Sequence, residues 1–271
     1  MIGSLLNGFR KPLQHPLSFL PGLALIGFIF LVFFIVSEQY FDLLVNIAVL
    51  GQVPDTSFFG LPFQILFLYS FDIAVLFIAS FVIAFAVVAT NFFYANFASE
   101  ALEKKPSLGE AFSKTLSEWK AALATVVFMF FLGALFGIVF WELFALASIS
   151  LAVSLVLLAL LALLVFFLLV KLVFFVPIMA IEKLSLRDAL GKSWAFTNRG
   201  FLGFLLLIIF LLLVSIIASV VSSIGSSLAD LVAIDFLNLL VFALFWAFSI
   251  AFSGSAIAFF YLKKGASANA R

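Results

Sequence analysis

Long apolar runs separated by short polar connections are the dominant pattern along this chain. A helix that crosses the hydrocarbon core of a bilayer needs about 20 largely apolar residues. Six runs meet this requirement, at residues 17–36, 66–98, 121–141, 146–177, 201–224 and 236–262. The runs are continuous rather than alternating over about ten residues, which excludes a transmembrane β-barrel. The pattern therefore predicts an all-α, polytopic membrane protein with six transmembrane helices.

The composition supports the same class of protein. Of the 271 residues, 66% are hydrophobic and only 10% are charged, and the mean hydropathy is +1.37. A water-exposed surface could not carry forty phenylalanines. We therefore expect residues 1–271 to form a single integral membrane domain that contacts the lipid bilayer.

Lysine and arginine are distributed on one side only. They occupy the segment before the first run, the connections after the second and fourth runs, and the segment after the sixth. The other connections contain acids but neither Lys nor Arg. Because cytoplasmic loops carry an excess of these cations, we expect a multi-pass protein of the cell (cytoplasmic) membrane with both termini cytoplasmic. The net charge of +1 implies no nucleic-acid partner.

A nine-residue pattern occurs twice, as SLGEAFSKT at 107–115 and as SLRDALGKS at 185–193. Each copy lies between two apolar runs, which predicts a duplicated hairpin with repeat units of about 66–141 and 146–224. In both copies the large apolar residues and the charged residues fall on opposite helical faces. We expect two amphipathic interfacial helices on the cytoplasmic side, with their large apolar side chains against the bundle or the acyl boundary.

Each copy of the repeat also carries the signals of a helix start. Ser107 and Ser185 are followed after three positions by an acid, which is the spacing of a capping box. A lysine follows each acid after four positions, the favourable order for an ion pair on a helix. A capped helix with a solvated face explains these positions better than a ligand site does. The same charged stripe is our candidate cytoplasmic docking surface for a cytoplasmic or membrane protein or an anionic lipid, formed by Glu103, Glu110, Lys114, Glu182, Asp188 and Lys192.

Few polar residues interrupt the apolar runs. Asp72 is an intramembrane polar candidate, although its run is long enough to place it near the outer boundary, so we favour a structural role over proton or cation handling. Lys171 lies near the inner end of the fourth run, and we expect its side chain to reach the cytoplasmic headgroups. Gly133 and Gly137 form a GxxxG pattern, which we interpret as a packing notch within the molecule.

Residues 174–207 place a Glu, a short turn, Ala-Leu and a Ser-Trp pair between two apolar runs. These positions are Glu182, Ala189, Leu190, Ser193 and Trp194. The pattern resembles prokaryotic membrane proteins that include the membrane domain of glycerophosphoryl diester phosphodiesterases and several domains of unknown function. The first copy of the repeat departs from it, because Thr115-Leu116 stands in place of Ser-Trp. The resemblance implies a six-helix, non-catalytic membrane domain. We expect no appended phosphodiesterase domain and therefore no hydrolase activity.

Three classes of function follow from these patterns. We expect first a non-enzymatic membrane domain that acts as a scaffold, an assembly factor or a partner-binding module. The alternative is a carrier or exporter of a lipid or another apolar small molecule. Transport of polar solutes or ions fits poorly, because the third, fifth and sixth runs contain no ionisable residue and we expect no mid-helix proline or broken span. An intramembrane enzyme is the weakest reading, because the chain has no HExxH, GxSxG or Walker motif and no cysteine. We accordingly expect no cofactor, no metal and no catalytic residue.

Overall fold

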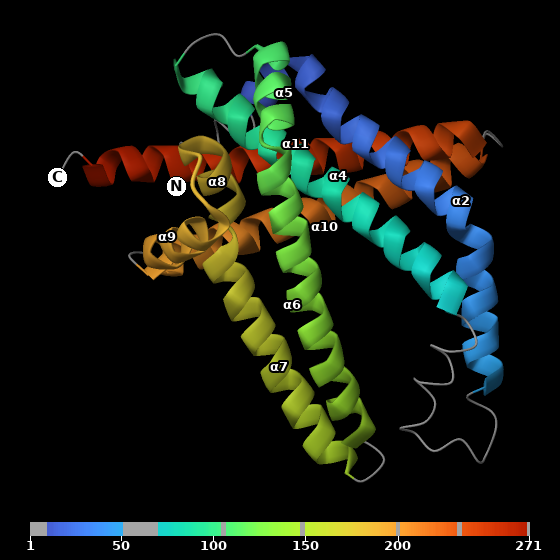
Figure 1. The fold of residues 1–271 in the computed structure, drawn as a ribbon. Coiled ribbons are helices and arrows are strands. Elements are labelled where there is room, and N and C mark those ends of the chain that lie inside the picture. Colours follow the sequence, from blue (N-terminus) through green and yellow to red (C-terminus); the bar gives the residue numbers. More distant parts are fainter. Residues whose placement is uncertain are drawn as a thin grey trace.

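The computed structural model describes residues 10–50, 70–103, 107–146, 150–198, 201–231 and 235–269. Every regular element in these ranges is a helix, which confirms the all-α prediction (Figure 1). The elements are η1 (Pro16–Phe19), α2 (Leu20–Leu50), α4 (Ser70–Glu103), α5 (Leu108–Ser117), α6 (Trp119–Ala145), α7 (Leu151–Leu172), α8 (Phe175–Glu182), α9 (Leu186–Asn198), α10 (Phe201–Leu231) and α11 (Asp235–Asn269).

Six segments of the described chain are long and apolar enough to cross a membrane. They are Pro16–Leu43, Ser70–Leu102, Trp119–Phe144, Leu151–Glu182, Phe201–Ile224 and Val241–Lys264. The prediction of six spans is therefore confirmed. Between the spans, α5 and α9 occupy the two copies of the repeated pattern.

The fourth span is broken, which corrects the expectation of unbroken spans. α7 ends at Leu172 and α8 begins at Phe175, with a turn between them. Pro177 explains the break, because it has no N–H to donate to the carbonyl of Val173 four residues earlier and its ring collides with that carbonyl. The helix resumes when the Ile178 N–H donates to the Phe174 carbonyl at 2.9 Å.

α4 is the central helix of the bundle. α2, α5, α6, α8 and α11 all pack against it (Figure 1). Its side chains at this crossing are among the largest that are fully buried, including Phe92, Tyr94 and Phe97. By contrast, α6 and α7 form a hairpin that leans away from α10 and α11 (Figure 1). The corresponding helix pairs of the two predicted repeat units are α4 with α6 and α7 with α10. The first pair makes a much more extensive contact than the second, so the two units pack differently. Their duplication stays a prediction.

Close helix approach occurs at glycines other than the predicted pair. Around Gly133 and Gly137, no atom lies within 4 Å of where a Cβ would stand, so the packing notch is wrong for the described residues. At Gly254 of α11, an added Cβ would lie 3.0 Å from the Cβ of Tyr94 on α4. At Gly22 of α2, it would lie 3.1 Å from the carbonyl oxygen of Ala247. These two glycines let α2, α4 and α11 cross closely.

A branched side chain at Gly254 should therefore loosen this crossing. We expect Gly254→Val to lower the free energy of unfolding by roughly 1–3 kcal/mol, because overpacking displaces Tyr94. Gly137→Val makes the same change on an open helix face and should have a much smaller effect. Thermal unfolding of the purified protein in detergent measures both. Equal losses for the two variants would contradict the close crossing.

Candidate functional site

A cavity of about 360 Å³ lies beside the break in the fourth span. Side chains of α4, α6, α7, α8, α10 and α11 line it, and so do residues on both sides of the break, including Leu172, Val173 and Pro177. The remaining lining is almost entirely Leu, Ile, Val, Phe and Met. The cavity thus lies between the hairpin of α4 and α6 and the helices that follow it.

Two polar side chains interrupt the apolar wall of this cavity, Asn91 of α4 and Ser215 of α10. The amide nitrogen of Asn91 donates to the Val87 carbonyl at 2.9 Å, which leaves the amide oxygen of Asn91 as an acceptor. The hydroxyls of Ser215 and Ser249 lie 3.3 Å apart. A largely apolar cavity with a few hydrogen-bonding atoms suits an apolar molecule that carries one polar group.

α9 holds the break in place through a buried serine. The Ser193 hydroxyl donates to the Lys171 carbonyl at 2.7 Å. In a continuous helix this carbonyl would accept from the N–H of Phe175, but the break removes that partner. An unpaired carbonyl in an apolar environment is costly, so the Ser193 hydroxyl compensates for the break. Ala189, which is fully buried, lets α9 approach closely enough.

Lys171 is enclosed rather than extended toward headgroups. Its side chain is 4% exposed, and its ammonium donates to the side-chain oxygen of Asn198. The ammonium lies 5.2–5.3 Å from the ring centroids of Phe167, Trp194 and Phe201, within the range of cation–π attraction. The prediction that Lys171 snorkels is therefore wrong. No local pattern indicates that rings from α7, α9 and α10 meet around this cation, because the three helices are brought together only by the fold.

Glu182 ties α8 to both α9 and α11. Its carboxylate accepts from the Lys192 ammonium of α9 and from the Tyr261 hydroxyl of α11. The predicted partner of Lys192 was Asp188, but Asp188 accepts from the Ser185 hydroxyl at 2.6 Å instead. A contact between helices thus replaces the pair within the helix.

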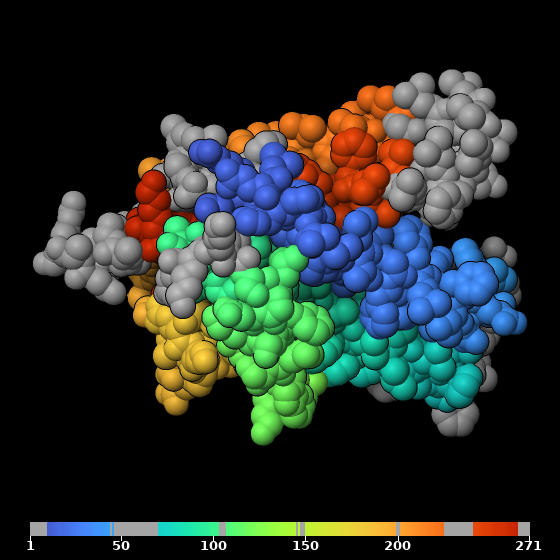
Figure 2. Space-filling view, turned by 90° about the horizontal axis from the view of Figure 1, so that it is seen from above, coloured from blue at the N-terminus to red at the C-terminus, as the bar shows by residue number. Residues whose placement is uncertain are grey.

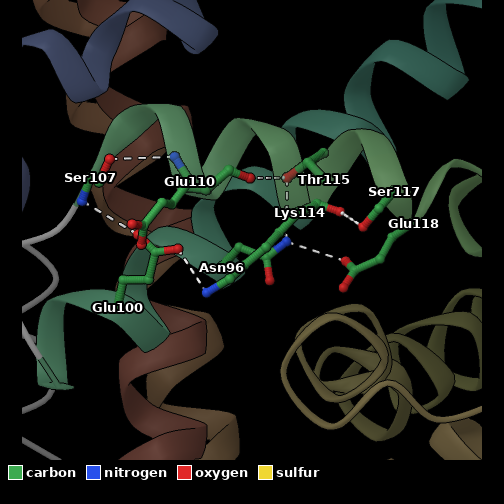
Figure 3. Close-up of polar contacts among 9 residues, drawn as sticks. Asn96, Glu100, Ser107, Glu110, Lys114, Thr115, Ser117 and Glu118 are labelled. Atoms are coloured by element: carbon green, nitrogen blue, oxygen red, sulfur yellow. Dashed lines mark hydrogen bonds and ion pairs between the residues drawn. The ribbon is translucent and has the colours of Figure 1, made fainter.

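The first copy repeats this arrangement with different residues (Figure 3). The Lys114 ammonium lies 2.8 Å from the Glu100 carboxylate of α4, rather than pairing with Glu110. Ser107 caps α5 by accepting from the Glu110 N–H at 3.4 Å, as predicted. In a capping box, the acid three residues after the cap accepts from the backbone N–H of the cap residue. Here Glu100 of α4 takes that role, because the Ser107 N–H donates to its carboxylate at 3.3 Å.

Asn96 connects α4 to the other end of α5 (Figure 3). Its amide nitrogen donates to the Thr115 hydroxyl at 3.3 Å and to the Glu118 carboxylate at 3.2 Å. Burial raises the pKa of Glu118, and the bond from Asn96 and the charges of Lys183 and Lys114 oppose this only in part. The cluster therefore fixes α5 on α4 and leaves one carboxyl that ionises less readily than usual.

Thr115 stands where the second copy has Ser193, and its bonds explain the departure from the motif. The Thr115 hydroxyl donates to the Ala111 carbonyl of its own helix at 2.8 Å. α4 is continuous up to Glu103, so it presents no carbonyl freed by a break. The serine of the Ser-Trp pair is thus needed only where the preceding span is broken.

Comparison with known families bears on this same region. Residues 144–270 match the family model for the membrane domain of glycerophosphoryl diester phosphodiesterase. The resemblance to this family is confirmed. The matched segment runs from α7 to α11 and so contains the break, its clamp by α9 and most of the cavity wall. The comparisons with curated proteins and with solved structures find no significant match.

In the segment that matches this family, the motif residues have structural roles. Ser193 pairs the freed carbonyl, Trp194 covers Lys171, and Glu182 joins three helices. The polar members of the motif are thus engaged within the protein. They position the broken span, and the cavity lies beside them.

The six docking residues are placed differently from one another. Lys114, Glu182 and Lys192 form ion pairs within the molecule. Glu110 and Asp188 are exposed, and the side chain of Glu103 lies outside the described residues. A docking role for this set stays a prediction.

Small residues are the most deeply buried positions of α5 and α9, and Leu108 and Leu190 pack against the bundle beside them. Ala111 and Ala189 are fully buried, whereas Phe112 is 57% and Trp194 is 40% exposed on the molecular surface. Their contact with acyl chains stays a prediction.

Asp72 lies in the first turn of α4, where a carboxylate is favoured by the helix dipole. The structural role that we expect for Asp72 stays a prediction.

Removal of the Ser193 hydroxyl should destabilise the broken span. We expect Ser193→Ala to lower the free energy of unfolding by about 1–3 kcal/mol, because the buried Lys171 carbonyl loses its partner. Ser117→Ala is the matched control, since its exposed hydroxyl bonds only to the Lys114 carbonyl of its own helix. Thermal unfolding in detergent compares the two. An equally small effect of both variants would show that Ser193 does not hold the break.

Proposed function

We propose that this chain is a non-enzymatic integral membrane protein that binds a lipid or another apolar small molecule in the cavity beside the broken fourth span. It acts as a carrier or exporter of that molecule. The observation that carries the proposal is the cavity itself, which is walled by five of the six candidate membrane spans. We further propose that it resides in the cell membrane with both termini cytoplasmic, because its cations are distributed on one side.

The chemistry of the cavity favours an apolar ligand. An apolar wall offers water almost no hydrogen bonds, so transfer of an apolar molecule into such a cavity is favourable. The backbone at the break adds polar character that an apolar wall otherwise lacks. Discontinuous helices also form the substrate sites of many membrane carriers, because freed backbone groups can contact the ligand there.

The same lining argues against catalysis at this site. Ser215 is the hydroxyl of the cavity wall, and neither a histidine, a lysine nor an acid lines the cavity to activate it. The phosphodiesterase named by the family description acts on glycerophosphoryl diesters. We carry neither that activity nor its substrate over to this chain, and the proposed ligand class rests on the lining of the cavity.

A scaffold or partner-binding role is the second candidate. Its support is the exposure of Glu110 and Asp188 on α5 and α9. The internal pairing of Lys114 and Lys192 weakens it, because their charges are already compensated by Glu100 and Glu182. Reversal of those two lysines would break contacts between helices as well as any docking surface.

A bulky residue in the cavity should displace the ligand. Ile208 lines the cavity, whereas its neighbour Ile209 is 41% exposed and is not part of the wall. We expect Ile208→Trp to reduce the lipid retained per protein by about tenfold, since the lost contacts correspond to about two methylene groups. Native mass spectrometry of the detergent-purified protein measures the bound lipid.

Ile209→Trp is the matched control and should retain lipid as the unmodified protein does. Movement of a fluorescent phospholipid across vesicles that contain the protein tests the carrier step, and the same pair of variants applies. Equal lipid retention in both variants would remove the cavity as the binding site. A protein without bound lipid would favour the scaffold role.

A further inference from the structure

A second apolar groove, of about 300 Å³, lies where α5 meets α2, α4 and α6. Pro21 and Phe28 of α2 line it, together with Phe112 and Leu116 of α5 and Trp119 at the start of α6. α5 (green) lies beside α2 (blue) on the face seen in Figure 2. The groove shares no lining residue with the cavity at the broken span, so an inference about it does not rest on the function proposed above.

The large apolar residues of α5 are available to a ligand. Phe112, Leu116 and Trp119 are 57%, 58% and 50% exposed although all three line the groove. Phe112 and Leu116 stay exposed because the buried positions of α5 are Ala111 and Thr115, and Trp119 follows them at the start of α6. Exposed apolar side chains are common on the spans of this protein, and these three are set apart because they also line a groove.

A cation lies at the α6 end of the groove. Lys120 is exposed, and its ammonium lies 5.8 Å from the ring centroid of Trp119. The charge of the neighbouring Lys114 is matched by Glu100, and the Glu118 carboxylate accepts from Asn96 of α4. Lys120 therefore offers a positive charge beside an apolar groove, and a Trp-Lys pair is typical of the level at which lipid headgroups lie.

We propose that this groove binds one acyl chain of an anionic phospholipid, with the headgroup phosphate at Lys120. The apolar lining accepts the chain, and the ammonium of Lys120 selects the anionic headgroup over a zwitterionic one. A soluble anion would meet the same charge but would leave the apolar groove unused. The lipid bilayer is thus the source of the ligand.

Trp119 itself reports on the occupant. A full-length protein that carries Trp141→Phe, Trp194→Phe and Trp246→Phe retains Trp119 as its only tryptophan. It is reconstituted into phosphatidylcholine vesicles that contain equal fractions of brominated phosphatidylglycerol or brominated phosphatidylcholine, whose bromines quench tryptophan fluorescence on contact. We expect stronger quenching by the anionic lipid. Lys120→Ala should lower this preference by about fivefold.

Two pairs of variants separate the groove from general membrane effects. Lys263→Ala removes a charge from another exposed lysine and should keep the preference. Ala24→Phe narrows the groove and should reduce quenching by both lipids, whereas Ala74→Phe, at the far end of α4, should not. Equal quenching by the two lipids, or no effect of Lys120→Ala or Ala24→Phe, would overturn the proposal. Ile208→Trp, combined with Trp119→Phe, changes the cavity at the broken span and leaves the groove without a tryptophan. It therefore tests the cavity independently of the groove.

Discussion

The absence of an N–H on Pro177 is the constraint on which the second half of this protein depends. It breaks the fourth candidate span between Leu172 and Phe175 and removes the helical partner of the Val173 carbonyl. Irregular backbone is tolerated there only when protein groups pair it or when it lines a cavity. Both conditions are met, because Ser193 pairs the Lys171 carbonyl and the residues of the break line the cavity.

α9 is shaped by this requirement. Its small residues let it approach α8, its serine reaches the freed carbonyl, and its tryptophan covers the ammonium of Lys171. α5 occupies the corresponding place beside the unbroken α4 and uses a threonine bonded within its own helix. The difference between the two helices follows from the difference between the spans that precede them. It also frees the large residues of α5 to line a groove of their own.

The length of the apolar runs predicts the six spans, and the repeated amphipathic pattern predicts the two intervening helices. The serine caps were also predictable, because a cap needs only residues that are near in sequence. The partners of Lys114, Lys192 and Lys171 were not, since each partner lies on another helix. The break has a local signal in Pro177, the last residue of the fourth apolar run. The cavity required the packing of several helices and had no local signal.

The link between the broken span and a bound lipid is tested most directly by a crystal structure of the full chain grown from a lipidic mesophase. We expect a break at residues 173–174, the Ser193 hydroxyl within hydrogen-bond distance of the Lys171 carbonyl, and acyl-chain density in the cavity bounded by Asn91 and Ser215. A continuous helix from Leu151 to Glu182, with side chains filling the space between α4, α6 and α10, would contradict it.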